Sequence, residues 1–539
     1  MLVIVLAWVV MELLINPRGN FPLNDDWWYA RTVRILLTEH HLKLAYFPAM
    51  SLLAHVLWGA LFSSVFGFSF HVLRLSTLVM GLAGIFVTYA LLREIHASRT
   101  MAFVGAMAIA LNPIYTELSN TFMTDVPFYA LAVLSIYLYV RGLGRESKAA
   151  IIAGTLVACV AALIRQVGVI FPISFAVAYL VKNGLRTRTV LTAVVPVALG
   201  LATLLGYQRW LSMTGNMPSQ YEVQTVFAQN FLHMGTWQMA VAVADFIRTI
   251  FVYLGLFLLP CLLLTLPREL KISRRSLLGW APSMAFFALL MGSLIYADQW
   301  MPLMRDRGNI LTDCQIGPVP IFDVWLLGLP YIEHAPRLLW QIVTIVGVAG
   351  AAILLRHVLT AIGDVTRRRK QPSPARWISV FVISVGVLYA GPLLLISKIC
   401  YFDRYFLPLM PLLMVAACLA SAQSGRISRV WAASALAVLL ILGGFGVAGT
   451  HDYFGWNRAR WKAYLDLVEV EKIPSTKVNG GYECNGWFSY REREDWEKFI
   501  DNTYVITLGP VDGYEVIEQY PVRNWLPYGQ DEILVLRRL

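Results

Sequence analysis

Two adjacent carboxylates near the start of the chain are its first candidates for chemistry. Asp25 and Asp26 follow Asn24, a few residues after a run of turn-forming residues at 16–20, and precede three aromatic residues at 27–29. Asn24 could simply cap a helix that begins at the acid pair, where the helix dipole favours negative charge. At the mouth of a membrane bundle the same carboxylates could take a proton or hold a cation. We favour this functional interpretation.

Four further ionisable residues lie at the ends of apolar runs. Asp125 could cap the helix that follows it, or could act beside the acid pair. Arg165 interrupts two apolar runs, and Lys398 and Arg404 lie between two others. These cations could be snorkelling anchors. They could equally bind a lipid phosphate, which the paired donors of a guanidinium suit.

The elements that must position these residues are membrane helices. Of the 539 residues, 58% are hydrophobic and only 14% are charged, whereas a soluble domain is typically about 25% charged. This composition excludes an ordinary soluble enzyme, and the long apolar runs exclude the alternating strands of an outer-membrane barrel. The sequence therefore predicts an all-α polytopic membrane protein with about thirteen spans. The expected spans are 1–15, 70–92, 101–117, 126–140, 149–164, 167–181, 189–207, 242–266, 277–296, 337–355, 377–397, 405–422 and 430–449.

The distribution of charge predicts the orientation in the membrane. The net charge of +11 could suit a nucleic-acid partner, but the basic residues sit in alternate short connections between apolar runs. Lys and Arg gather on the cytoplasmic side of membrane proteins, so we expect those connections in the cytoplasm. The N-terminus is then cytoplasmic, and a long first loop at 17–69 lies outside with two interfacial helices near 27–40 and 47–66. Residues 1–15 lack a basic leader and a cleavage site, so we expect a retained span.

The chain divides into a transmembrane domain at 1–449 and an extracytoplasmic α/β domain at 450–539. The second domain is expected to contain helices at 456–471 and 491–500 and strands near 478, 504–508, 514–520 and 533–536. The segment 480–487 is rich in groups that could bind a sugar or peptide. Its glycines could also make turns, and we favour that structural interpretation. The six cysteines have no spacing typical of a metal site or a disulfide framework.

Five segments together resemble the polytopic GT-C glycosyltransferases. The segments are Asn24 to Ala30, Phe66 to Ser76, Thr121 to Pro127, Arg165 with Gln166, and Arg404 to Pro408. They are similar to the glycosyltransferase family 39-like group, which includes the protein O-mannosyltransferases and the lipid A aminoarabinose transferases. The resemblance covers roughly residues 1 to 450. It implies a GT-C fold in a bacterial plasma (inner) membrane. It also implies transfer of a hexosyl or pentosyl group, usually with inversion, from a polyprenyl-phosphate donor to an acceptor on the outer face.

The resemblance also implies roles for individual residues. A first-loop acid is the catalytic base, for which we expect Asp25 with Asp26 second. Asp125 would assist in positioning an acceptor or a metal. Arg165, Arg404 and Lys398 would bind the donor phosphate, where cations stabilise the departing group.

Metal dependence stays open at this point. Aminoarabinose transferases carry an acidic and a basic residue just before the proline that opens the second surface helix, whereas here Tyr46 and Phe47 precede Pro48. The family's metal and phosphate contacts at that point are therefore not carried over. A divalent metal could still use outer-side histidines, which lack a ligand spacing. They are His40, His41, His55 and His233.

Two other functions compete with the glycosyltransferase. A transporter or flippase for an envelope lipid should show repeat symmetry and ionisable groups near the bilayer midplane. Here the mid-span positions are almost free of charge. A glycan ligase or polymerase would share the lipid-linked donor but would leave the acid pair less well explained. The acceptor could be a lipid, a glycan or a protein.

Overall fold

The computed structural model describes most of the chain. It covers residues 1–45, 48–269, 274–304, 309–313, 315–318, 335–367, 374–398, 401–421, 428–490, 500–529 and 531–539. The expected helix at 491–500 lies outside the described residues except for residue 500. Residues 46–47, at the start of the second expected interfacial helix, also lie outside them.

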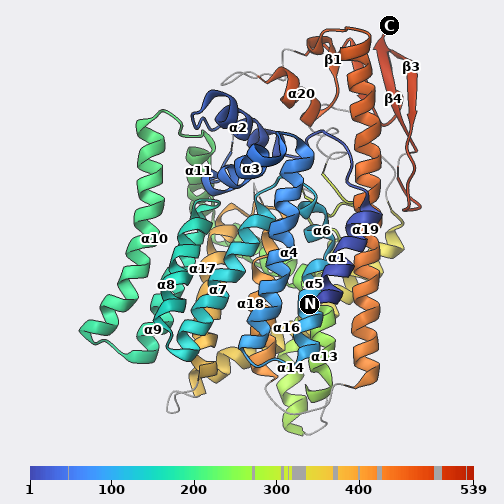
Figure 1. Ribbon diagram of the computed structural model, residues 1–539. Coiled ribbons are helices and arrows are strands. Elements are labelled where there is room, and N and C mark those ends of the chain that lie inside the picture. The colour runs from blue at the N-terminus through green and yellow to red at the C-terminus, as the bar shows by residue number, and fades with distance from the viewer. Residues whose placement is uncertain are drawn as a thin grey trace.

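The described residues form a helical bundle with a cap at one end (Figure 1). Ten helices are long and apolar enough to cross a membrane, or eleven if one bent pair counts as a single span. The predicted polytopic all-α fold is therefore confirmed. The long helices are α4 (Phe70–Glu94), α7 (Asp125–Arg145), α9 (Ile170–Asn183) with its 3-10 turn η1 (Gln166–Val169), α10 (Thr187–Met213), α12 (Thr236–Phe257), α14 (Arg274–Tyr296), α16 (Arg337–Arg367), α17 (Pro374–Ile396), α18 (Leu409–Ala420) with its 3-10 turn η3 (Asp403–Phe406), and α19 (Arg429–Leu465).

Two of the thirteen expected spans are short helices. These are α1 (Leu2–Ile15) and α8 (Lys148–Ala162), which at 1.5 Å per residue are only about 21 and 22 Å long. The hydrocarbon core is about 30 Å thick. Both helices are therefore shorter than this thickness.

The expected span 101–117 is broken into two helices. Helix α5 (Arg99–Ala110) and helix α6 (Pro113–Ser119) meet at a bend of 60°. Pro113 has no N–H to continue the first helix, and the Asn112 side chain accepts hydrogen bonds from the amides of Ile114 and Tyr115 at 2.9 and 3.2 Å. The second helix thus starts with its own cap. The bend delivers residues 120–124 to the capped end of the bundle.

Small residues let the helices approach closely in the bundle. At Gly255 of α12, an added Cβ would lie 2.3 Å from the backbone nitrogen of Ala351 in α16. Such contacts are typical of helix packing in membranes, where close van der Waals packing replaces the hydrophobic effect. The pair of helices α12 and α16 supports the turn η3. Helix α12 packs on η3 itself, and α16 packs on α18, the helix that follows η3.

The cap contains α2 (Asp26–Glu39), α3 (Leu53–Phe66), α20 (Tyr482–Ser489) and a four-stranded sheet. Helix α19 has 37 residues and is about 55 Å long, so it projects beyond a bilayer and carries the sheet (Figure 1). The strand order is β1 (Val478–Asn479), β2 (Tyr504–Thr507), β4 (Glu532–Arg538), β3 (Tyr514–Pro521). Only β1 and β2 are parallel. The four predicted strands are confirmed, and the expected helix 456–471 is the end of α19 with a π turn at Asp466–Val470.

Candidate active site

Asp25 stands at the N-cap position of α2 without capping it. Its side chain makes no hydrogen bond to the first turn of the helix, and the side chain of Asn24, the alternative cap, makes none either. The Asp25 side chain is 25% exposed, and its Oδ1 accepts a hydrogen bond of 2.9 Å from the Tyr482 hydroxyl. That hydroxyl accepts a bond of 3.0 Å from Nε1 of Trp28. The carboxylate is therefore oriented by its neighbours and still open to an incoming group.

Asp26 is turned into the protein instead. Its side chain is fully buried, and its two oxygens accept the backbone amides of Leu23 at 2.7 Å and Phe122 at 3.2 Å. Burial raises the pKa of Asp26 to about 8, against the lowering effect of Arg74 and of these two amides. Asp26 thus ties the first loop to the segment after α6, and no face of its carboxyl group is open to a substrate.

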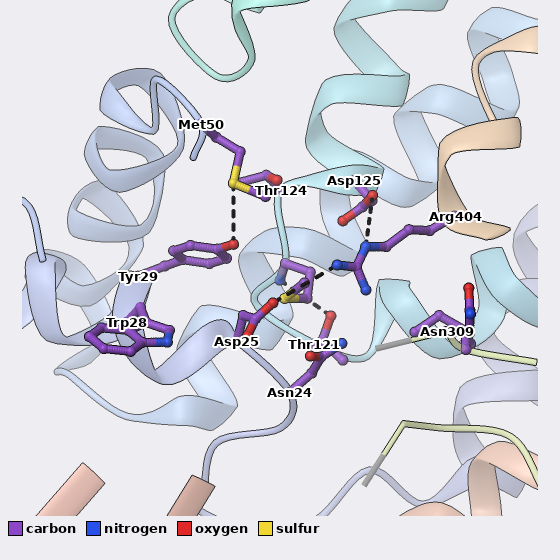
Figure 2. A network of polar contacts seen from close by, with 12 residues as sticks. Asn24, Asp25, Trp28, Tyr29, Met50, Thr121, Thr124, Asp125, Asn309 and Arg404 are labelled. Atoms are coloured by element: carbon purple, nitrogen blue, oxygen red, sulfur yellow. Dashed lines mark hydrogen bonds and ion pairs between the residues drawn. The ribbon is translucent and has the colours of Figure 1, made fainter. Parts of the chain in front are cut away.

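Two arginines converge on Asp25 and Asp125. Figure 2 shows one of them, Arg404, between the two carboxylates. Nη2 of Arg404 lies 3.9 Å from Oδ2 of Asp25, and Nε of the same side chain lies 3.8 Å from Oδ1 of Asp125. Nη2 of Arg165 lies 2.8 Å from that Oδ1 and donates to the Thr124 hydroxyl at 2.8 Å. Asp125 is the first residue of α7, and its side chain makes no hydrogen bond to the helix. It holds the two guanidinium groups in one place.

Four segments far apart in the sequence build this cluster. Asp25 precedes α2, Asp125 begins α7, Arg165 precedes η1 and Arg404 lies in η3. Each is at the junction of a loop and a helix, where backbone groups leave the helical pattern and side chains can point into the same space. The cluster therefore depends on the packing of the whole bundle.

Lys398 does not join the cluster. Its Nζ lies 3.5 Å from Oδ2 of Asp245, and Asp245 also pairs with Arg248 on the same helix, α12. The structure therefore brings together Asp25, Asp125, Arg165 and Arg404 among the predicted site residues. Asp26 lies beside them in a structural position, and Lys398 belongs to a separate ion-pair group.

Opposing electrostatic effects act on the pKa of Asp25, the candidate proton acceptor. Burial raises the pKa of Asp25 above its usual value, while the positive charge of Arg404 and the hydrogen bond from Tyr482 act in the opposite direction. A raised pKa makes a carboxylate a stronger base. Burial also raises the pKa of the Tyr482 phenol well above its usual value, so this hydroxyl stays protonated and can donate to Asp25.

Tyr482 and Glu483 are site residues that the sequence reasoning did not assign. Glu483 is buried, pairs with Arg460 and accepts the backbone amide of Asn24 at 3.1 Å. Helix α20 thus holds both the side chain of Asp25 and the backbone next to it. The segment 480–487 was noted for its polar and aromatic groups, but no periodicity could indicate a contact across more than 450 residues.

The described residues contain no group of three or more His, Cys, Asp and Glu side chains that could hold a metal ion. Among the outer histidines, His55 is fully buried, with Nε2 at 3.0 Å from the carbonyl oxygen of Phe122 and its ring stacked on that phenylalanine. His41 lies 3.7 Å from Glu39 at the surface. Neither arrangement has the geometry of a metal site.

Comparison with known proteins gives a partial family match. The model of the family described as dolichyl-phosphate-mannose-protein mannosyltransferase matches residues 53–210, which run from the start of α3 to the last turn of α10. This confirms over that region the predicted resemblance to the protein mannosyltransferases of the GT-C class. Asp125 and Arg165 lie inside the match, whereas Asp25 and Arg404 lie outside it. No curated protein sequence matches the chain.

Solved structures are also similar to this chain at low sequence identity. ArnT from Cupriavidus metallidurans in the apo state is 13% identical over 99% of this chain and 97% of its own, with a TM-score of 0.40. The same protein bound to undecaprenyl phosphate is 14% identical, with the same coverage and a TM-score of 0.41. The apo Archaeoglobus fulgidus oligosaccharyltransferase is 16% identical over 87% of this chain but 57% of its own, with a TM-score of 0.45.

Proposed function

We propose that the protein is a membrane glycosyltransferase that moves a sugar from a polyprenyl-phosphate donor to an acceptor nucleophile, with inversion at the anomeric carbon. The observation that carries the proposal is the partly open Asp25 carboxylate beside the buried guanidinium groups of Arg404 and Arg165. The family match supports a donor of this class, since the description of that family names a dolichyl-phosphate sugar.

In the proposed reaction, Asp25 is the general base. The acceptor nucleophile attacks the anomeric carbon while its proton passes to Asp25. The bond between that carbon and the phosphate oxygen breaks, and its electron pair leaves with the polyprenyl phosphate. Arg404 and Arg165 stabilise the leaving phosphate, because preorganised cations are most effective where negative charge develops.

The net charge of the cluster can stay constant during the proposed transfer. Before reaction, Asp25 and Asp125 balance Arg165 and Arg404. Protonation removes the negative charge of Asp25 from beside Arg404 as the leaving phosphate gains one. Arg404 can therefore exchange one anionic partner for another without a change in the net charge of a buried site, where unbalanced charge is costly. In this scheme Asp125 positions the arginines and Asp26 positions the loop.

We place the capped end of the bundle outside the cytoplasm, in a plasma membrane. Arg93, Arg145 and Lys182 lie near the ends of α4, α7 and α9 that are far from the cap. Positive charge of this kind marks the cytoplasmic side. The N-terminus is then cytoplasmic, and the sheet and α20 are extracytoplasmic.

The test is the lipid composition of the host after deletion of the gene. Mass spectrometry of polyprenyl-phosphate sugars should show one species accumulating, reversed by the wild-type gene but not by Asp25→Asn. Asp298→Asn is a matched control, since Asp298 is 61% exposed and pairs with Arg337 instead, and it should complement fully. An unchanged donor pool, with envelope lipids retained on the cytoplasmic side, would overturn the proposal in favour of a flippase.

A further inference from the structure

A cavity lies in the cap, close to the Asp25 cluster. It has a volume of about 560 Å³, which is within the range of about 300 to 1,000 Å³ typical of small-molecule sites. Its walls are the first loop at residues 19–22, the outer end of α19 from Arg458 to Leu465, the π turn with Asp466 and Glu469, and Trp487 with Phe488 of α20. The reaction proposed above uses none of these side chains.

Four aromatic residues line it, and Phe488 is the most exposed of them. Phe21 stacks on Trp461, with ring centroids 5.9 Å apart and planes 6° from parallel. Phe488 lies 6.3 Å from the Trp461 ring and is 40% exposed. An aromatic face carries partial negative charge, so it attracts the polarised C–H groups on one side of a sugar ring. The exposed ring of Phe488, tilted by 43° from that of Trp461, provides such a face.

The charged groups of the cavity balance one another. Arg458 and Lys462 are opposed by Asp466 and Glu469. Nζ of Lys462 lies 2.6 Å from Oδ2 of Asp466, and Arg458 donates to the carbonyl oxygen of Asn16 at 3.0 Å. Both cations thus already have partners, and the acids would repel a phosphate. This arrangement favours a neutral or zwitterionic ligand with many hydroxyl groups over a polyanion.

The cavity is connected to the catalytic cluster through two short stretches of chain. Pro22 precedes Asp25 by three residues, so their Cα atoms are at most about 11 Å apart. Helix α20 carries Tyr482, which contacts Asp25, and Phe488, which lines the cavity. These two residues are about 9 Å apart along the helix axis. A ligand in the cavity would therefore lie within a few sugar rings of the base.

We propose that this cavity binds a neutral or zwitterionic sugar residue of an acceptor glycan. The proposal rests on the proposed function, because it assigns the class of acceptor for the same enzyme. Phe488 supplies the stacking face, and the paired charges at the rim accept and donate hydrogen bonds to hydroxyl groups. The nucleophile of the same glycan can then reach Asp25.

The proposal is tested by binding, without catalysis. The full-length protein in detergent is applied to an array of immobilised neutral oligosaccharides of two to four hexoses, amino-bearing versions, and versions carrying a phosphate or carboxylate. We expect retention on neutral or amino-bearing oligosaccharides. Phe488→Leu, which keeps apolar volume but removes the ring, should weaken that retention by roughly fivefold, and Phe488→Tyr should restore it.

Trp525→Ala is the control, because Trp525 is an exposed aromatic of the same domain that does not line the cavity. It should bind like the wild type. Any of three results would overturn the proposal. The protein could be retained only on the anionic oligosaccharides, its retention could be competed only by serine- and threonine-containing peptides, or Phe488→Leu could bind as well as the wild type. No retention of any oligosaccharide would do the same. The array needs no sugar donor. A negative binding result can therefore be distinguished from a negative result in the donor-pool experiment, which tests the proposed function.

Discussion

Replacing Tyr482 by phenylalanine should change the pH dependence of transfer while leaving the fold intact. The substitution removes only the hydroxyl that donates to Oδ1 of Asp25 at 2.9 Å. That bond favours the charged form of the carboxylate, and it is one of the influences that hold down a pKa raised by burial. Its loss should therefore raise the pKa of Asp25 further.

The size of the shift follows from the strength of the bond. A hydrogen bond to a charged group is worth about 1.5 to 3 kcal/mol, and one pKa unit corresponds to about 1.4 kcal/mol. Because Asp25 is one quarter exposed, water can replace part of the lost interaction, and we expect a shift of about one unit. A general base acts only when deprotonated, so activity is present above its pKa and is lost as the pH falls. The acidic limb of the profile should therefore move to higher pH.

The assay is kcat/KM for sugar transfer between about pH 5 and pH 9, which reports the ionisation of the free enzyme. Tyr514→Phe is the matched control, since its hydroxyl donates to the carbonyl oxygen of Asn502 in the sheet domain. It should leave the profile unchanged. If Tyr482→Phe folds normally and its acidic limb coincides with that of the wild type, Asp25 is not the base or Tyr482 does not act on it.

Three further predictions follow from the site. Arg404→Ala should raise the KM for the polyprenyl-phosphate donor by at least about tenfold, and Arg404→Lys should restore little, because a lysine lacks the paired donors of a guanidinium; an unchanged donor KM in both variants would refute the phosphate role. Asp26→Asn should act on stability, lowering the free energy of unfolding by about 1 to 3 kcal/mol because a buried backbone amide loses its acceptor. Thermal unfolding with a parallel rate measurement checks this, and a large loss of kcat without a loss of stability would contradict it. In a cysteine-free background, Asp512→Cys should react with a membrane-impermeant thiol reagent from outside intact cells and Leu185→Cys should not; the reverse pattern would invert the proposed orientation.

Some features of this protein can be predicted from local sequence. Hydropathy located the membrane helices, because the free energy of transferring about 20 apolar residues into lipid is a property of the segment itself. The four strands were found in the same way, from β-branched and aromatic residues between turn signals. The acid pair at Asp25 and Asp26 and the arginines at 165 and 404 also stood out, since charge at the end of an apolar run is visible without a structure.

Only the tertiary structure distinguished the neighbours in these groups. Asp25 and Asp26 are identical in type and adjacent in sequence, yet packing against residues 120–124 buries one carboxylate while the other faces Tyr482 and Arg404. Arg404 and Lys398 are six residues apart, and they pair with different helices. These outcomes depend on contacts between segments hundreds of residues apart, whose free energy belongs to the pair and to neither segment alone. For the same reason, the contact of α20 with Asp25 emerges only when the whole bundle is assembled.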